Sequence, residues 1–271
     1  LVSANRPHEA LASLEDLHAH LPLAQKWAFF WGAQTRALHM IGQHERELQA
    51  ARMARDSLAG PLFGMTYEGR ALAALGRVDD LMSLVAEIAV APPQPGLTPG
   101  DALPDLALEA RAHGHPDVSL RIADRALAWL DGQPEDFQAS AVGRALRGGL
   151  LYEHGDWQQA ATAFAGLAAD SVDLVEALGY QGTTAARLGD PDRANEFDRQ
   201  LAALPSPRSH GAITLWRARI AATLGRRDQA VRLLRQAFNE GLGYGIWLHR
   251  DADLLSLHGY GPFDELLRPS G

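Results

Sequence analysis

Arginine is the residue type whose spacing along this chain most suggests binding chemistry. Arg36, Arg70 and Arg219 each stand six residues before a glycine, and Arg111 stands three residues before another. A guanidinium presents parallel N–H groups that match a carboxylate, so arginines aligned on one face would bind acidic groups. The recurrence therefore indicates recognition of an acidic ligand rather than a chemical reaction.

The histidines could bind a metal ion only if several of them meet. His18 and His20 are two residues apart, as are His113 and His115. Side chains at that spacing point away from one another on a helix, so such a pair could chelate an ion only in a loop. We interpret the histidines as solvated or core residues, and we predict no metal site and no cofactor.

Catalytic patterns are also missing from the sequence. There is no nucleophile elbow, zinc-protease helix, phosphate-binding loop or dinucleotide fingerprint, and no cysteine. The carboxylate pair Asp79–Asp80 fits the first turn of a helix, where negative charge is favourable. Asp251 and Asp253 resemble helix caps. We therefore predict a protein that is not an enzyme.

Composition sets further limits. The 271 residues carry a net charge of −8, and 46% of them are hydrophobic, enough to fill a core. The negative charge disfavours nucleic acid as a partner, and the lack of a long apolar run excludes a membrane span. A cytoplasmic location is expected. The chain starts at Leu1 without a leader, which we read as a fragment or a processed product.

A glycine recurs between pairs of amphipathic segments, and this repeat must position the arginines. The intervals between successive glycines are 34, 38, 41, 34 and 36 residues, and the glycines are Gly42, Gly76, Gly114, Gly155, Gly189 and Gly225. Glycine adopts the left-handed conformation that ends a helix without steric cost. Seven residues before three of these glycines stand Gly148, Gly182 and Ala218, which are small enough for two helices to cross closely.

This pattern resembles the tetratricopeptide repeat, a helix–turn–helix unit of about 34 residues. The resemblance implies an all-α fold, a right-handed α-solenoid of about six helix pairs. We predict one domain over 1–271, with a half repeat at 1–22, six repeats at 23–241, a proline-rich loop at 91–100 followed by Asp101 as an N-cap, and a C-terminal cap at 242–271. The residues expected to cover the last repeat are Trp247, Leu248, Leu254, Leu255, Phe263, Leu266 and Leu267.

The two ends resemble a more specific group. WLHRDADLLSLHGYGPFDELLRP is similar to the end of bacterial tetratricopeptide-type regions that follow a kinase domain or a DNA-binding domain. RPHEALASLEDL and ALHMIGQHERELQAARMAR are similar to the start of such regions. The resemblance implies a sensory or interaction module of a larger bacterial regulatory protein.

In such repeats the first helix of each pair lines the concave groove. Counting back from the turn glycines places eight candidate ligand-binding residues there: Phe29, Arg36, His39, Phe63, Arg70, Arg111, Tyr152 and Arg219. Related modules grip acidic peptide tails in this way. The alternative is that the arginines pair with acids of this chain such as Glu68 or Glu109. The aromatic run Trp27–Trp31 is assigned mainly to the core, with one ring open to the groove.

The function predicted from the sequence is a non-catalytic scaffold that binds a protein or peptide, with an acidic segment or carboxylate in the groove. One alternative is self-assembly, in which the exposed terminal repeat pairs with a second copy. Another is a small-molecule site in the superhelix. No nucleic acid or membrane partner is expected.

Overall fold

The chain folds entirely into helices and connecting loops wherever its structure is described. The computed structural model describes residues 1–165, 167, 174–205 and 210–270. Within them there are sixteen α-helices and three short 3-10 helices, and the extended pairing is limited to one bridge between Gln94 and Leu97. The predicted all-α class is confirmed. None of the described helices is both long enough and apolar enough to cross a membrane.

The helices group into two compact units. The first comprises Leu1–Trp129, Tyr244–Arg250 and Arg268–Gly271, and the second comprises Leu130–Gly243 and Asp251–Leu267. Helices of the first unit are α1 (Pro7–His20), α2 (Ala28–Met40), α3 (His44–Ser57), α4 (Leu62–Ala74), α5 (Val78–Ala89), α6 (Pro99–Ala112), α7 (Pro116–Asp131, whose last two residues fall in the second unit) and α15 (Trp247–Arg250), with η1 (Val2–Ala4) and η2 (Pro22–Lys26).

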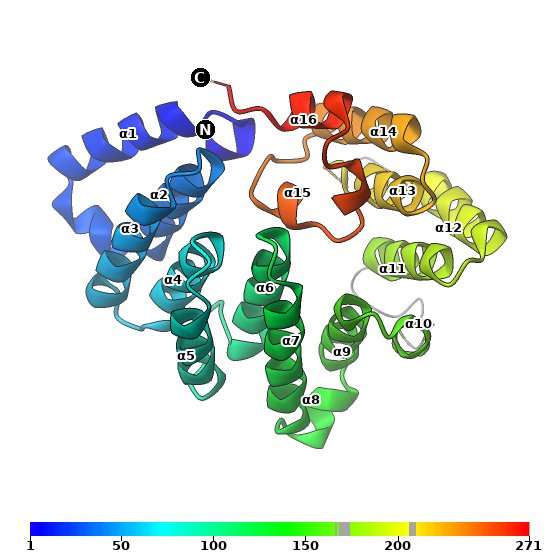
Figure 1. Cartoon of the computed structure of the whole chain (residues 1–271), viewed down its shortest axis with the longest axis horizontal. Helices are drawn as coiled ribbons and strands as arrows, with labels where there is room; N and C mark the ends of the chain where they lie inside the picture. The colour runs from blue at the N-terminus through cyan, green and yellow to red at the C-terminus, as the bar shows by residue number, and fades with distance from the viewer. Residues whose placement is uncertain (166, 168–173, 206–209, 271) are drawn as a thin grey trace. The chain divides into compact units, whose positions relative to one another are not determined.

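Helices of the second unit are α8 (Glu135–Ala139), α9 (Ala141–His154), α10 (Trp157–Ala165), α11 (Leu174–Arg187), α12 (Pro191–Ala203), α13 (Ala212–Thr223), α14 (Arg227–Asn239), η3 (Leu255–Leu257) and α16 (Gly261–Leu267). In both units, consecutive helices form hairpins, and each hairpin lies beside the next one along the chain (Figure 1). This is the helical-repeat arrangement of an α-solenoid.

The six glycines that define the repeat all lie in turns between paired helices. Their φ angles are 70°, 67°, 84°, 96°, 77° and 75° in chain order. These values lie in the left-handed region, where a side chain with a Cβ is strained. The glycine pattern in the sequence therefore marks the helix pairs correctly.

A single turn allows this backbone requirement to be measured. A Cβ placed on Gly189 would meet no atom within 4 Å, so substitution there tests conformation without a clash. We expect Gly189→Ala to lower the free energy of unfolding by about 1–2 kcal/mol, and Gly189→Asn by less, because asparagine tolerates this conformation. Urea denaturation followed by circular dichroism would measure both, and equal stability of all three proteins would contradict the expectation.

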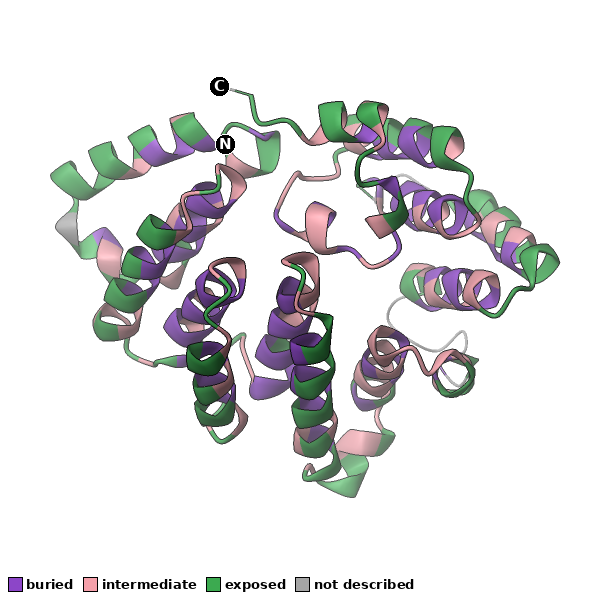
Figure 2. Ribbon diagram, viewed as in Figure 1, coloured by how far each residue is buried: buried purple, intermediate pink, exposed green. Residues whose placement is uncertain are grey.

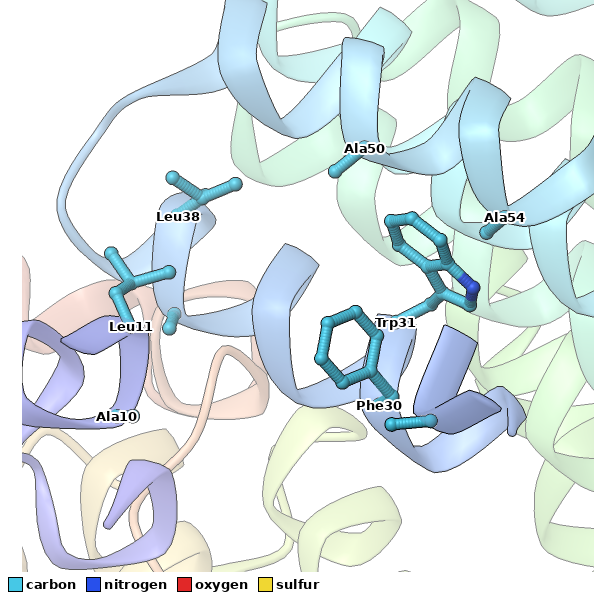
Figure 3. Packing of buried hydrophobic residues seen from close by; sticks show 9 residues of the cluster. Ala10, Leu11, Phe30, Trp31, Leu38, Ala50 and Ala54 are labelled. Atoms are coloured by element: carbon cyan, nitrogen blue, oxygen red, sulfur yellow. The ribbon is translucent and has the colours of Figure 1, made fainter. Parts of the chain in front are cut away.

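In the first unit the core is built on the aromatic run of α2. Phe30 and Trp31 are buried against Leu38, Ala50 and Ala54, and α1 adds Ala10 and Leu11 (Figure 3). The Trp31 indole donates to the Gln25 carbonyl at 2.8 Å. The other two rings of the run face outward, since Trp27 is 52% exposed and Phe29 is 77% exposed. The helices thus carry buried inner faces and exposed outer faces (Figure 2).

In the second unit small residues allow large apolar side chains to lie against helix backbones. A Cβ at Gly148 would stand 2.6 Å from the ring of Phe164, and a Cβ at Gly182 would stand 2.4 Å from Ile220. Phe164 stacks on Tyr180 with ring centroids 4.3 Å apart. These approaches confirm the prediction that the two glycines mark close helix crossings.

The loop and the tail depart in detail from the sequence interpretation. Helix α6 starts at Pro99 with Thr98 as its N-cap, and the Thr98 backbone N–H donates to Asp101 at 2.8 Å in a capping box. Asp101 is therefore the third residue of the helix and not its cap. In the tail, α16 packs against α14, whereas α15 packs against α6 in the first unit.

Candidate functional site

A pocket of about 530 Å³ lies in the first unit where α2, α4 and α6 supply their neighbouring faces. We call it the arginine pocket. Its lining comprises Ala28, Phe29, Gly32, Arg36, Phe63, Thr66, Tyr67, Arg70, Leu97, Asp101 and Asp105. Four of the eight predicted ligand-binding residues line it together, namely Phe29, Arg36, Phe63 and Arg70. The i, i+3 and i+4 spacing on α2 and α4 brings them to one side.

Its two arginines lie close together. Arg70 is only 5% exposed, and its guanidinium donates to the Thr35 hydroxyl at 3.0 Å. Arg36 donates through Nε to the Gly32 carbonyl at 2.9 Å. Within the described residues neither guanidinium forms an ion pair, and Nε of Arg70 is buried without a hydrogen-bond acceptor. Burial and the positive charge of Arg70 both lower the pKa of Arg36.

Aromatic rings border these cations. The Arg70 guanidinium lies over the Tyr67 ring at 5.1 Å from its centroid, and the Tyr67 hydroxyl donates to the Ala28 carbonyl at 3.2 Å. Gly32 leaves room for that hydroxyl, because a Cβ there would stand 2.9 Å from it. Phe29, which is mostly exposed, stands at the pocket as an open apolar surface. The lining can thus bind a negative group and an apolar group side by side.

The acids of the pocket are engaged with other groups. Asp101 accepts from both the backbone and the hydroxyl of Thr98, and Asp105 pairs with Arg250. The acids proposed as partners of the arginines are also engaged elsewhere. Glu68 forms ion pairs with Arg52 and Arg55, and Glu109 contacts the imidazole of His39. The alternative in which Glu68 or Glu109 neutralises Arg36 and Arg70 is therefore wrong.

Two predicted site residues have internal partners in the second unit. Arg219 pairs with Asp251 at 2.7 Å, and the Tyr152 hydroxyl donates to Asp253. Asp253 also binds Arg187 at 3.1 Å. These acids are buried partners of cations and not the helix caps expected from the sequence. Arg219 and Tyr152 are therefore not available to a ligand, which corrects their assignment to a binding groove.

Arg111 and His39 also lie outside the lining of the arginine pocket. Arg111 is half-buried near Ser119, with its Nη2 3.5 Å from the hydroxyl. His39 is buried, and its Nδ1 lies 2.9 Å from Glu47. On α6, Asp105 lines the pocket and Glu109 contacts His39.

His39 belongs to a group that we call the histidine–glutamate cluster: His39, His44, Glu47, Glu109, His113 and His249. Burial by itself lowers the pKa of His39, but contacts with Glu109 and Glu47 outweigh it and raise the pKa to about 9. Burial by itself raises the pKa of Glu109, but the neighbouring imidazoles outweigh it and hold that pKa well below its ordinary value. The cluster is thus a strongly coupled ionic centre.

The sequence contained part of this signal. Glu109 precedes His113 by four residues, and Glu47 follows His44 by three, so each pair shares a helix face. The expectation that no acidic residue stands four positions from a histidine to complete a set of ligands is therefore wrong. His249 could not have been placed from sequence, because it comes from α15 in the tail.

Comparison with solved structures finds a similar arrangement in a tetratricopeptide repeat protein from Parabacteroides merdae ATCC 43184. The identity is 13%, the match covers 93% of each chain, and the TM-score is 0.49. No protein-family model and no curated protein sequence matches the chain. The assignment to helical-repeat folds rests on the helix hairpins of the structure itself.

Proposed function

We propose that this chain is a non-catalytic scaffold that binds a protein or peptide through a carboxylate held in the arginine pocket. The observation that carries the proposal is the pair Arg36 and Arg70, two neighbouring cations without an ion pair in the described structure. Placing like charges together in a desolvated site is unfavourable, and perturbed ionisable groups that line a pocket indicate a candidate functional site. A bound carboxylate would relieve this repulsion.

The ligand expected in the pocket has two parts. Its carboxylate accepts hydrogen bonds from the guanidinium of Arg36 and from the unsatisfied Nε–H of Arg70. An apolar side chain next to it packs on Phe29 and Phe63, which line the same pocket. An acidic peptide segment with a neighbouring apolar residue fits this description, and so does a peptide that ends in a free carboxylate.

Peptide binding provides the test. Fluorescent peptides that combine Asp or Glu with an apolar residue and a free C-terminus would be compared with amidated Asn and Gln counterparts by fluorescence anisotropy. We expect the acidic peptides to bind and Arg36→Gln with Phe29→Ala to weaken binding at least tenfold, since each charged hydrogen bond is worth about 1.5–3 kcal/mol. Added salt should reproduce part of the loss.

Controls separate binding from folding. Arg121 is exposed on α7, away from the pocket, so Arg121→Gln removes the same charge and should leave peptide affinity unchanged. Arg36→Gln should leave the melting temperature unchanged or raise it, because it removes the charge repulsion with Arg70. Equal affinity for acidic and amidated peptides, or equal losses in the Arg36 and Arg121 variants, would disprove the proposal.

A further inference from the structure

Three histidines of the cluster surround one carboxylate oxygen of Glu109. Oε1 of Glu109 lies 3.0 Å from Nε2 of His39, 3.0 Å from Nε2 of His113 and 3.4 Å from Nε2 of His249. These residues come from α2, α6 and α15 of the first unit. Their candidate ligand atoms all lie within 4.8 Å of one another.

Hydrogen bonding alone does not satisfy this arrangement. A carboxylate oxygen has about two lone-pair sites, so it cannot accept well from three ring N–H groups at once. Nε2 of His113 forms an aligned hydrogen bond with this oxygen, whereas Nε2 of His39 and Nε2 of His249 lie near it, are buried and form no aligned hydrogen bond. Unsatisfied buried polar atoms are costly and require an explanation.

A metal ion would use these same atoms. In a tetrahedral zinc site with Zn–N bonds of about 2.0–2.1 Å, neighbouring ligand atoms are about 3.3 Å apart. The three distances to Glu109 are close to that edge length, so small side-chain movements would complete the coordination shell. Imidazole nitrogens suit zinc, and the chain has no cysteine that could offer another type of zinc site.

Residues around the cluster orient these ligands. Nδ1 of His39 lies 2.9 Å from Oε2 of Glu47, the carboxylate–histidine arrangement that directs the opposite ring nitrogen toward a metal. Oε2 of Glu109 is contacted by Nη1 of Arg250 at 3.3 Å, which leaves Oε1 toward the imidazoles. His39 and Glu109 are thus each oriented by a charged residue, Glu47 or Arg250, that contacts the atom opposite the proposed ligand atom.

We propose that His39, His113, His249 and Glu109 form a four-ligand structural site for Zn²⁺. Four protein ligands fill a tetrahedral shell, which is typical of structural rather than catalytic zinc. The ion would fasten α15 to α2 and α6 in the first unit. This site is independent of the peptide-binding function proposed above, since none of its ligands lines the arginine pocket.

Metal titration of the full chain tests the site. After treatment with a chelator, we expect the wild-type protein to take up one Co²⁺ with the visible absorption of tetrahedral coordination, and one Zn²⁺ that displaces it. The variant His113→Gln with His249→Gln should bind the metal at least tenfold more weakly. Even residues that only hydrogen-bond to metal ligands contribute about 10–100-fold to metal affinity, and these two residues are ligands themselves. Glu47→Gln should show a loss of about that size.

A matched control uses two histidines outside the cluster. His18 and His20 are exposed on α1, so His18→Gln with His20→Gln should leave both metal titrations unchanged. If the cluster variant fails to fold, the wild-type protein decides the matter, because added Zn²⁺ should raise its melting temperature. Wild-type protein that retains less than one Zn²⁺ at micromolar free metal, or that binds no more tightly than the cluster variant, would overturn the proposal.

Discussion

Arg219→Met is expected to lower the free energy of unfolding by about 3–5 kcal/mol, the range for breaking one side of a buried ion pair. Arg219 pairs with Asp251, which is 8% exposed, and its guanidinium lies 4.2 Å from the Trp216 ring centroid. Burial by itself lowers the pKa of Arg219, but Asp251 and Asp253 outweigh it and raise that pKa. Methionine would fill the space and leave two buried carboxylates without this cation.

The reference for that loss is an exposed pair in the same unit. Arg199 and Glu196 form a contact of 2.5 Å with side chains 68% and 50% exposed. Arg199→Met should therefore change stability by about 0–1 kcal/mol in urea denaturation. Adding Asp251→Asn to Arg219→Met should recover part of the loss, because it removes the unpaired charge. Similar effects of the two methionine variants would show that the buried pair contributes little.

Gly64→Ala should lower the free energy of unfolding of the first unit. Overpacking costs about 1–3 kcal/mol, and we expect a loss near the upper end of that range. A Cβ on Gly64 would stand 2.5 Å from both the backbone nitrogen and Cα of Arg55. Backbone atoms of α3 cannot rotate away as a side chain can, so α3 and α4 would have to separate. Urea denaturation gives the size of the loss, and faster hydrogen exchange in α3 and α4 would locate it.

Gly149→Ala is the matching substitution in a helix with free space. The nearest atom to its added Cβ would be the Tyr180 hydroxyl oxygen at 3.9 Å. Alanine is favoured over glycine inside helices, so this variant should gain up to about 1 kcal/mol. The two glycine substitutions are therefore expected to have opposite signs. A neutral Gly64→Ala would show that the two helices separate at little cost.

The helix pairs could be predicted from sequence because their turns have a local signature. A left-handed turn needs glycine, and the flanking segments carry apolar residues at helical spacing. The turn glycines also set the register of α2 and α4, so the sequence predicts that Phe29, Arg36, Phe63 and Arg70 share one site, and all four line the pocket. On α6 the same count selects Arg111, which does not line the pocket, whereas Asp105 does.

The rest of the candidate site depends on contacts between distant residues. Arg219 occupies the same repeat position as Arg36 and Arg70, yet it pairs with Asp251 of the tail. Tyr152 likewise donates to Asp253 of the tail. Likewise, His249 and Arg250 complete the environment of Glu109. A repeat pattern describes each unit relative to its neighbours in sequence, so it carries no information on a tail that returns to earlier helices.

The division of the chain between its two units has a consequence for biosynthesis. Tyr244–Arg250 and Arg268–Gly271 belong to the first unit, although Leu130–Gly243 of the second unit lies between them and the rest of the first unit in the sequence. On a ribosome, helices α1–α7 would emerge long before the segment that supplies Arg250 to Glu109 and Asp105. Asp105 and Glu109 of α6 therefore gain the contacts of Arg250 only after residues 130–243 have also been translated. The first unit can thus be completed only after Leu130–Gly243 of the second unit has been synthesised.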